Sequence, residues 1–255
     1  MSLYITSNTK SASPTPDMSE VMSPKSPNKK PTKSAKVYPK TKDELRKFIK
    51  DEVNRQGPDA DLNHIDVSKI TDMSGLFYWP GSIEGPGLDV RNIKINKWNV
   101  SNVTDMSNMF ARCWYFVGDL SKWDVSNVTD MSYMFKYCSH FAGDLSNWNV
   151  SKVENMERMF CGCTNFNSDL SKWNVSNVTN MVCMFYKCKN FNSDLSKWDV
   201  SNVTDMSSMF YSCYDFNSDL SSWDVSNVTD MSYMFQNCYK FNSDLSIWDV
   251  SSATR

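Results

Sequence analysis

The sequence has few of the residues and segments that characterise several large functional classes. It contains two histidines, His64 and His140, too few for a histidine metal cluster. The 27 basic and 29 acidic side chains give a net charge of −2, without the basic excess usual in dedicated nucleic-acid-binding proteins. No apolar run approaches the ~20 residues that span a bilayer, and the N-terminus shows no signal peptide. We therefore expect a location inside a cell or within a virus particle.

Arrangements typical of catalysis are missing as well. Only three glycines follow residue 90, so no glycine-rich loop is present there to hold a phosphate. Neither histidine stands near a plausible nucleophile. The sequence predicts no catalytic residue, no metal ligand and no cofactor, and we expect a protein that is not an enzyme.

Residues 1–40 are rich in proline, serine and lysine. They hold six of the nine prolines, and seven lysines against two acidic residues give this segment a charge of +5. So little apolar surface cannot offset the entropy of an ordered backbone, so we expect a flexible basic arm. The arm would either be a solvated tail or contact an anionic partner, namely nucleic acid, a membrane surface or an acidic protein. Its clustered lysines are Lys29, Lys30, Lys33, Lys36 and Lys40.

Residues 41–60 predict an N-terminal capping helix. Thr41 and Glu44 have the spacing of a capping box, and Gly57 before Pro58 provides a stop after residue 56. A single apolar stripe on a short helix must pack on something, and the open end of the following array is the expected partner. The residues of that stripe are Leu45, Phe48, Ile49 and Val53.

The rest of the chain, residues 61–255, is a repeat of 25 residues. A diverged first copy begins at Asp61, and an insertion near residues 78–90 separates it from the regular copies. We expect about eight coils in total. The period is marked by Trp98, Trp123, Trp148, Trp173, Trp198, Trp223 and Trp248.

A fixed period of this length, with apolar residues at constant positions, predicts a solenoid of stacked coils. The spacing L-x-x-W-x-V is that of a leucine-rich repeat strand, and T-D-M-S-x-M-F-x-x-C predicts a short capped helix. The expected fold class is therefore a leucine-rich-repeat-like solenoid, with one short parallel strand and one short helix in each 25-residue coil. Equivalent residues would form ladders of tryptophan, methionine, phenylalanine and cysteine.

The repeat resembles the BspA-like leucine-rich repeat family. The similarity lies in M-F-x-x-C-x-x-F preceded by L-x-x-W-x-V-x-x-V-x-x-M, and it is greatest to the W-[DN]-V-S-N-V-T-[DN]-M branch of surface proteins. This resemblance implies a right-handed solenoid and a non-enzymatic role in binding or adhesion. Such proteins occur on bacterial surfaces, in protists and in large DNA viruses. Because no signal peptide or wall anchor is seen, we expect a component of an assembly, with a surface adhesin as the alternative.

The cysteine and aspartate ladders each have a chemical as well as a structural interpretation. The in-phase cysteines, from Cys113 to Cys238, are expected to be reduced core residues, while the out-of-phase Cys161 and Cys183 are expected to be more exposed. The aspartates at each D-L-S would either bind calcium along a spine or cap their own turns, and the second interpretation is favoured. The ladder consists of Asp119, Asp144, Asp169, Asp194, Asp219 and Asp244.

The function expected from these features is that of a repeat scaffold for protein–protein interaction. The last unit ends directly after a predicted strand, and solenoid ends normally need a polar cap. We therefore expect its edge to contact another protein or a second copy of the chain. The residues predicted to form this interface are Leu245, Ile247, Trp248 and Val250. Polar rows on the outer surface, such as the one containing Lys122 and Lys172, are a further candidate for ligand binding.

Overall fold

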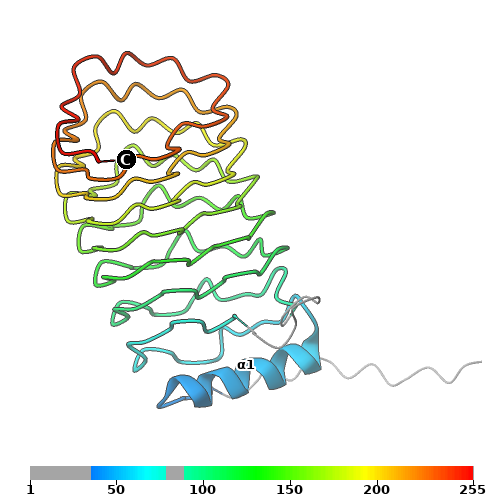
Figure 1. Cartoon of the computed structure of the whole chain (residues 1–255). Helices are drawn as coiled ribbons and strands as arrows, with labels where there is room; N and C mark the ends of the chain where they lie inside the picture. Colours follow the sequence, from blue (N-terminus) through cyan, green and yellow to red (C-terminus); the bar gives the residue numbers. More distant parts are fainter. Residues whose placement is uncertain (1–35, 79–88, 255) are drawn as a thin grey trace, which may run out of the picture. The chain divides into compact units, whose positions relative to one another are not determined.

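The computed structural model describes residues 36–78 and 89–254. From Trp98 onward each 25-residue unit makes one coil that lies against the preceding one (Figure 1). Isolated parallel β-bridges connect equivalent residues of successive coils, so the register between coils is one repeat. The bridges within the regular array join Asp105 to Asp130, Asp130 to Asn155, Asn155 to Asn180, Asn180 to Asp205, and Asp205 to Asp230.

Each coil is a series of tight turns. We number the repeat from position 1 at the tryptophan to position 25, and residues 173–197 serve as the example. In most of these turns the backbone N–H of the last residue donates to the carbonyl oxygen of the residue three positions earlier, and both end residues are buried and apolar. Five such bonds, at 2.9 to 3.1 Å, join Leu170 to Trp173, Val175 to Val178, Met181 to Met184, Phe185 to Cys188, and Cys188 to Phe191.

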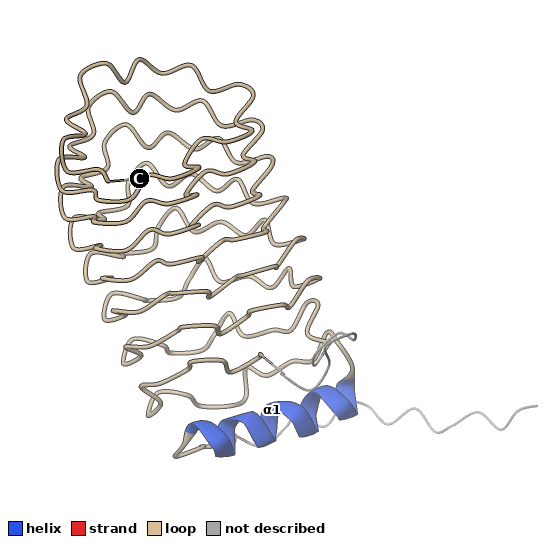
Figure 2. Cartoon of the chain, viewed as in Figure 1, coloured by secondary structure: helices blue, strands red, loops and turns tan. Residues whose placement is uncertain are grey.

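The strand and helix expected in every coil are not formed. Within residues 36–78 and 89–254 the one helix is α1, and no extended strand is present (Figure 2). Positions 11 and 15 adopt left-handed backbone conformations, with φ of 53° at Cys183 and 60° at Lys187. Their N–H groups therefore donate to Ser207 O and Tyr211 O of the next coil, at 2.9 and 2.7 Å, and no α-helical bonding pattern develops.

Equivalent apolar side chains form ladders through the core. The rings of Trp173 and Trp198 are stacked with centroids 6.5 Å apart, and those of Phe185 and Phe210 with centroids 5.7 Å apart. Within one coil Phe185 also stacks on Phe191 at 4.0 Å. Because a coil buries these rings only against its neighbours, the coils stabilise one another in the manner of other repeat proteins.

Helix α1, Lys42–Gln56, packs against the first coil. Thr41 caps its start by accepting a hydrogen bond from the Glu44 N–H, whereas the Glu44 carboxylate accepts from the Lys40 N–H at 2.7 Å. Leu45, Ile49 and Val53 join the common core. Phe48, predicted to share that buried stripe, is instead 37% exposed, because it lies at the margin of the face that meets the coil.

Part of the predicted arm belongs to the folded unit. The Val37 N–H donates to His64 O, and Val37 O accepts from the Asp66 N–H at 2.8 Å, which forms a parallel bridge with the first coil. Pro39 is buried. Val37 therefore pairs with the first coil, whereas residues 1–35 of the predicted arm lie outside the described residues.

In the described parts of the chain, none of the helical structure has the length and apolar character required to cross a lipid bilayer.

Candidate interaction surfaces

The repeated Asp and Asn residues cap the turns that follow them. Asp169 Oδ1 accepts from the Ser171 N–H at 2.9 Å, and Asn180 Oδ1 accepts from the Val182 N–H at 3.0 Å. Positions 2, 8 and 22 all make this contact, and Asn replaces Asp at two of them. The position thus requires an acceptor oxygen rather than a negative charge.

The aspartate ladder at position 22 consists of such caps. The backbone N–H of Ser171 holds the pKa of the Asp169 carboxyl below its usual value, and the Ser171 side chain acts in the same direction. The negative charge of Asp144 raises the pKa of Asp169 by less than these hydrogen bonds lower it. Across residues 36–78 and 89–254, no three His, Cys, Asp or Glu side chains gather as a metal site would require. Turn capping therefore explains the aspartate ladder.

The cysteine ladder is made of buried thiols. Cys188 Sγ donates to Phe160 O of the preceding coil at 2.9 Å, and Cys163 Sγ donates to Phe135 O in the same way. Burial raises the pKa of the Cys113 thiol to about 12 and that of Cys161 to about 11. All eight cysteines are free thiols. Cys183 is partly exposed, but the expectation of an exposed Cys161 is wrong, because its side chain packs inside its turn.

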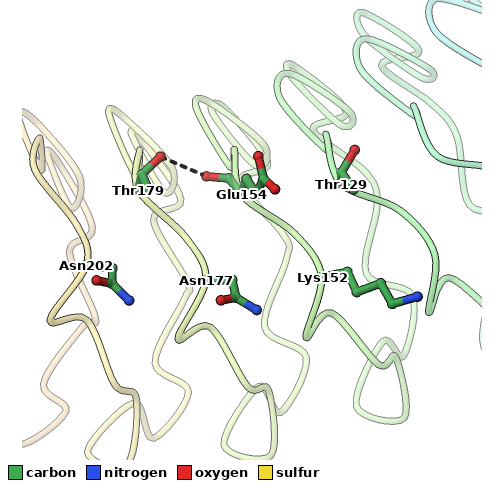
Figure 3. A pocket seen from close by; sticks show the side chains of 6 residues that line it. All are labelled: Thr129, Lys152, Glu154, Asn177, Thr179 and Asn202. Carbon is green, nitrogen blue, oxygen red and sulfur yellow. Dashed lines mark hydrogen bonds between the residues drawn. The ribbon is translucent and has the colours of Figure 1, made fainter.

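A shallow groove of about 450 Å³ runs over the Asn and Thr rows at positions 5 and 7 (Figure 3). Its polar groups bind neighbouring coils: Asn177 Nδ2 donates to Ser151 O at 2.7 Å, and Thr179 Oγ1 donates to Glu154 O at 3.3 Å. The Asn–Thr rows therefore hold the coils in register, and the sequence N-x-T serves that contact. The groove is lined by Thr129, Lys152, Glu154, Asn177, Thr179 and Asn202.

The residues predicted for the C-terminal interface lie together on the last described coil. Ile247 and Val250 are 74% and 50% exposed. Leu245 and Trp248 pack on the core from one side, and Trp248 Nε1 donates to Leu220 O at 2.9 Å. The arm lysines divide in two: Lys36 and Lys40 are exposed, whereas Lys29, Lys30 and Lys33 lie outside the described residues.

A further surface consists of positions 10, 11, 14, 15, 17 and 18 of the six complete units, residues 98–247, which we call the variable face. It includes the five positions with the most residue types, although positions 2, 5, 7, 8, 20, 21 and 25 also differ between units. Hydrogen bonds between coils align these positions along one side of the array. Eight of the 11 tyrosines of the chain lie here: Tyr115, Tyr133, Tyr137, Tyr186, Tyr211, Tyr214, Tyr233 and Tyr239.

Aromatic and basic side chains contact one another along this face. Tyr186 stacks on Tyr211 with centroids 4.7 Å apart, and Lys187 Nζ lies 5.1 Å from the centroid of the Tyr186 ring. Lys136 Nζ lies over Tyr133 and Tyr137, at 5.0 and 5.4 Å. Cation–π contacts of this kind orient exposed side chains. No single motif of the sequence indicates this surface, because it becomes apparent only when the units are compared position by position.

A constant framework that carries a variable surface defines a tandem-repeat protein. The chain belongs to the family described as "Mycoplasma protein of unknown function, DUF285", whose model matches residues 47–160, 88–195 and 162–255. This is a repeat family related to BspA-like surface repeats.

Comparisons with curated proteins and with solved structures add little to this family assignment. No curated protein gives a significant match. One solved structure, described as "Crystal structure of TLR13-ssRNA13 complex", is similar over 84% of this chain and 38% of that chain, with 9% sequence identity and a TM-score of 0.26.

Proposed function

We propose that this protein is a non-catalytic scaffold that binds other proteins through its variable face, as a component of a larger assembly. The proposed fold class is a leucine-rich-repeat-like solenoid of the BspA-like branch named above, modified in that each coil is a series of turns. The supporting observation is that the five positions at which the units differ most all belong to the variable face. The apolar positions that build the coil are nearly constant, whereas most side chains of the variable face are at least partly exposed.

The composition of the variable face supports a protein partner. Tyrosine, serine and asparagine occupy more than half of its 36 positions. The same residues predominate in antibody paratopes, because tyrosine gives a large contact area at low entropic cost while serine and asparagine give adaptable hydrogen bonds. Every Trp and Tyr of residues 98–254 that is classed as exposed belongs to this face: Trp114, Tyr115, Tyr137, Tyr233 and Tyr239.

Partner capture with matched variants tests this function. The face variant combines Tyr115→Asn, Tyr137→Ser and Tyr239→Ser, each a residue that another unit carries at the same position. The control combines Asn202→Lys and Thr204→Glu, which copy Lys152 and Glu154 onto a neighbouring coil of the Asn–Thr rows. Proteins crosslinked to the tagged chain in its native source are quantified by mass spectrometry.

We expect specific crosslinks to be lost in the face variant and kept in the control. Equal crosslinking by wild type and both variants would show that the variable face is not the binding surface.

A further inference from the structure

The variable face carries a charge opposite to that of the remaining array surface. Its six basic side chains stand against two acidic ones, Glu157 and Asp215. At all other positions of residues 98–247 four basic side chains stand against fourteen acidic ones. The side of the array that bears the exposed tyrosines is thus locally positive on an acidic protein, and such a patch attracts anionic groups.

Four of the six cations remain available for a partner. Arg158 pairs with Glu157, and Lys240 Nζ lies 2.6 Å from Asp215 Oδ1. Among the described residues, the other four form no ion pair with an acidic side chain. These are Arg112, Lys136, Lys187 and Lys189, which we call the cation row.

The cation row extends along the axis of the array. Its members belong to the first, second and fourth complete units, so they span about three coil steps, or ~15 Å at the ~4.8 Å spacing of paired strands. An extended peptide of about five residues has that length. Lys187 and Lys189 flank the Tyr186 and Tyr214 rings, with Nζ to centroid distances of 5.1 and 5.4 Å, so cations and apolar ring surface alternate.

On this basis, and resting on the proposed function, we infer that the variable face binds an extended acidic segment of a partner protein that runs along the axis of the array. The carboxylates of the segment pair with the cation row, and the exposed ring of Tyr137 packs against its backbone and apolar side chains. Electrostatic complementarity of this type sets partner choice and orientation.

The tyrosine contacts favour a peptide over single-stranded nucleic acid. Nucleic acid binds to open aromatic faces on which bases stack, together with a groove of dense positive charge. Here Tyr186 is stacked on Tyr211 and is also contacted by Lys187.

Fluorescence anisotropy with a labelled peptide of alternating glutamate and serine, long enough to span four coils at ~3.3 Å per residue, tests the inference. The face variant is Arg112→Ser, Lys136→Gln, Lys187→Ser and Lys189→Ser. The control, with the same loss of four charges, is Lys122→Ser, Lys152→Asn, Lys172→Ser and Lys197→Ser. Every new residue is found at the same position of another unit, so both variants keep the framework.

We expect the face variant to weaken peptide binding about tenfold or more, while the control changes Kd less than about twofold. If both variants weaken peptide binding equally, the effect arises from net charge alone, and the inference is overturned. Tighter binding of a polyuridylate of equal charge, lost in the same face variant, would replace the peptide by nucleic acid. If the peptide does not bind while partner capture still depends on the tyrosines, the inference of an acidic segment is refuted and the proposed scaffold function is retained.

Discussion

The side chain at repeat position 22 is an aspartate in every complete unit, and its oxygen accepts a hydrogen bond from the serine N–H two residues later. Asp169 Oδ1 lies 2.9 Å from Ser171 N, while Asn174 Oδ1, at position 2, makes the equivalent contact with Ser176 N at 3.1 Å. The neutral amide and the carboxylate thus perform the same task. At the scale of the residue, the repeat selects for a short acceptor at the start of each turn.

Replacing Asp169 distinguishes the acceptor from the charge. We expect Asp169→Ala to lower the free energy of unfolding by about 1 kcal/mol, the usual net value of one hydrogen bond, and Asp169→Asn to change it by much less. Urea denaturation at pH 7, followed by tryptophan fluorescence, measures both. A loss of the same size in the two variants would show that the negative charge is what the turn requires.

The same hydrogen bonds predict a loss of stability in acid. The pKa of Asp169, like that of Asp144 and Asp219, lies below the usual value, chiefly because of hydrogen bonds from the following serine. The unfolded chain therefore takes up protons first. Stability is fully present above the unfolded pKa of about 4 and falls as the pH drops through the lower folded values.

The thiol ladder predicts a loss of stability in alkali. An unfolded cysteine ionises near pH 8.5, whereas burial keeps Cys188 protonated and raises the pKa of Cys113 to about 12. Above about pH 8.5 the unfolded chain binds fewer protons than the folded one, so each thiol removes up to ~1.4 kcal/mol per pH unit. Urea unfolding at pH 7.5 and about 9.5 measures this slope. It should be shallower in Cys163→Ala/Cys188→Ala, and identical slopes would mean that the ladder thiols ionise in the folded state.

At the scale of the element, the four-residue turn replaces the strand and the helix. Two successive turns, M-x-x-M and F-x-x-C, place their end residues at spacings of three, one and three. An amphipathic helix gives the same spacing on its buried face. The apolar pattern alone therefore identified the buried residues but not the backbone conformation that buries them. The residue at position 11 is left-handed but is not a glycine, so no sequence signal indicated the turn.

Ser208 tests the left-handed position directly. Its φ is 54°, a conformation that costs an L-residue roughly 1–2 kcal/mol, and its N–H donates to Ser232 O at 2.8 Å. We expect Ser208→Gly to leave stability unchanged or raise it by up to about 1 kcal/mol, because relief of strain opposes the greater entropy of the unfolded chain. Ser208→Val should lower it by about 2 kcal/mol, since a branched side chain tolerates this conformation poorly.

Chemical denaturation of both Ser208 variants provides the measurement. If Val were tolerated as well as Gly, position 11 would not be held in the left-handed region in solution.

At the scale of the whole molecule, the period predicted more than the individual motifs did. It placed the tryptophan, phenylalanine and cysteine residues in ladders, and rings at equivalent positions do stack, as at Trp198 and Trp223 with centroids 6.4 Å apart. The variable face was missed because no single unit contains it. Tyr186 and Tyr211 come into contact only when two coils lie in register, so this surface is a property of the array.

Deletion of a whole unit tests whether the coils are interchangeable. Removing residues 174–198 joins Trp173 to Asp199 and restores the sequence W-D-V, so every contact between coils can re-form one repeat later. Stability in a repeat array is close to a sum of units and nearest-neighbour interfaces. We expect the shortened chain to unfold cooperatively with Tm lowered by roughly 2–4 °C for each kcal/mol lost.

The control removes about half a unit, residues 174–186, and joins position 1 directly to position 15. Trp173 would then be followed by Lys187, and the turns beginning at Val175, Met181 and Phe185 would be missing. The coil would be too short to close over the Trp and Phe ladders of its neighbours. Circular dichroism, tryptophan fluorescence and size-exclusion chromatography compare the two deletions. Loss of folding in the half-unit deletion alone is the result that interchangeable coils require. Equal tolerance of both deletions would mean that the chain does not depend on closed coils stacked in register.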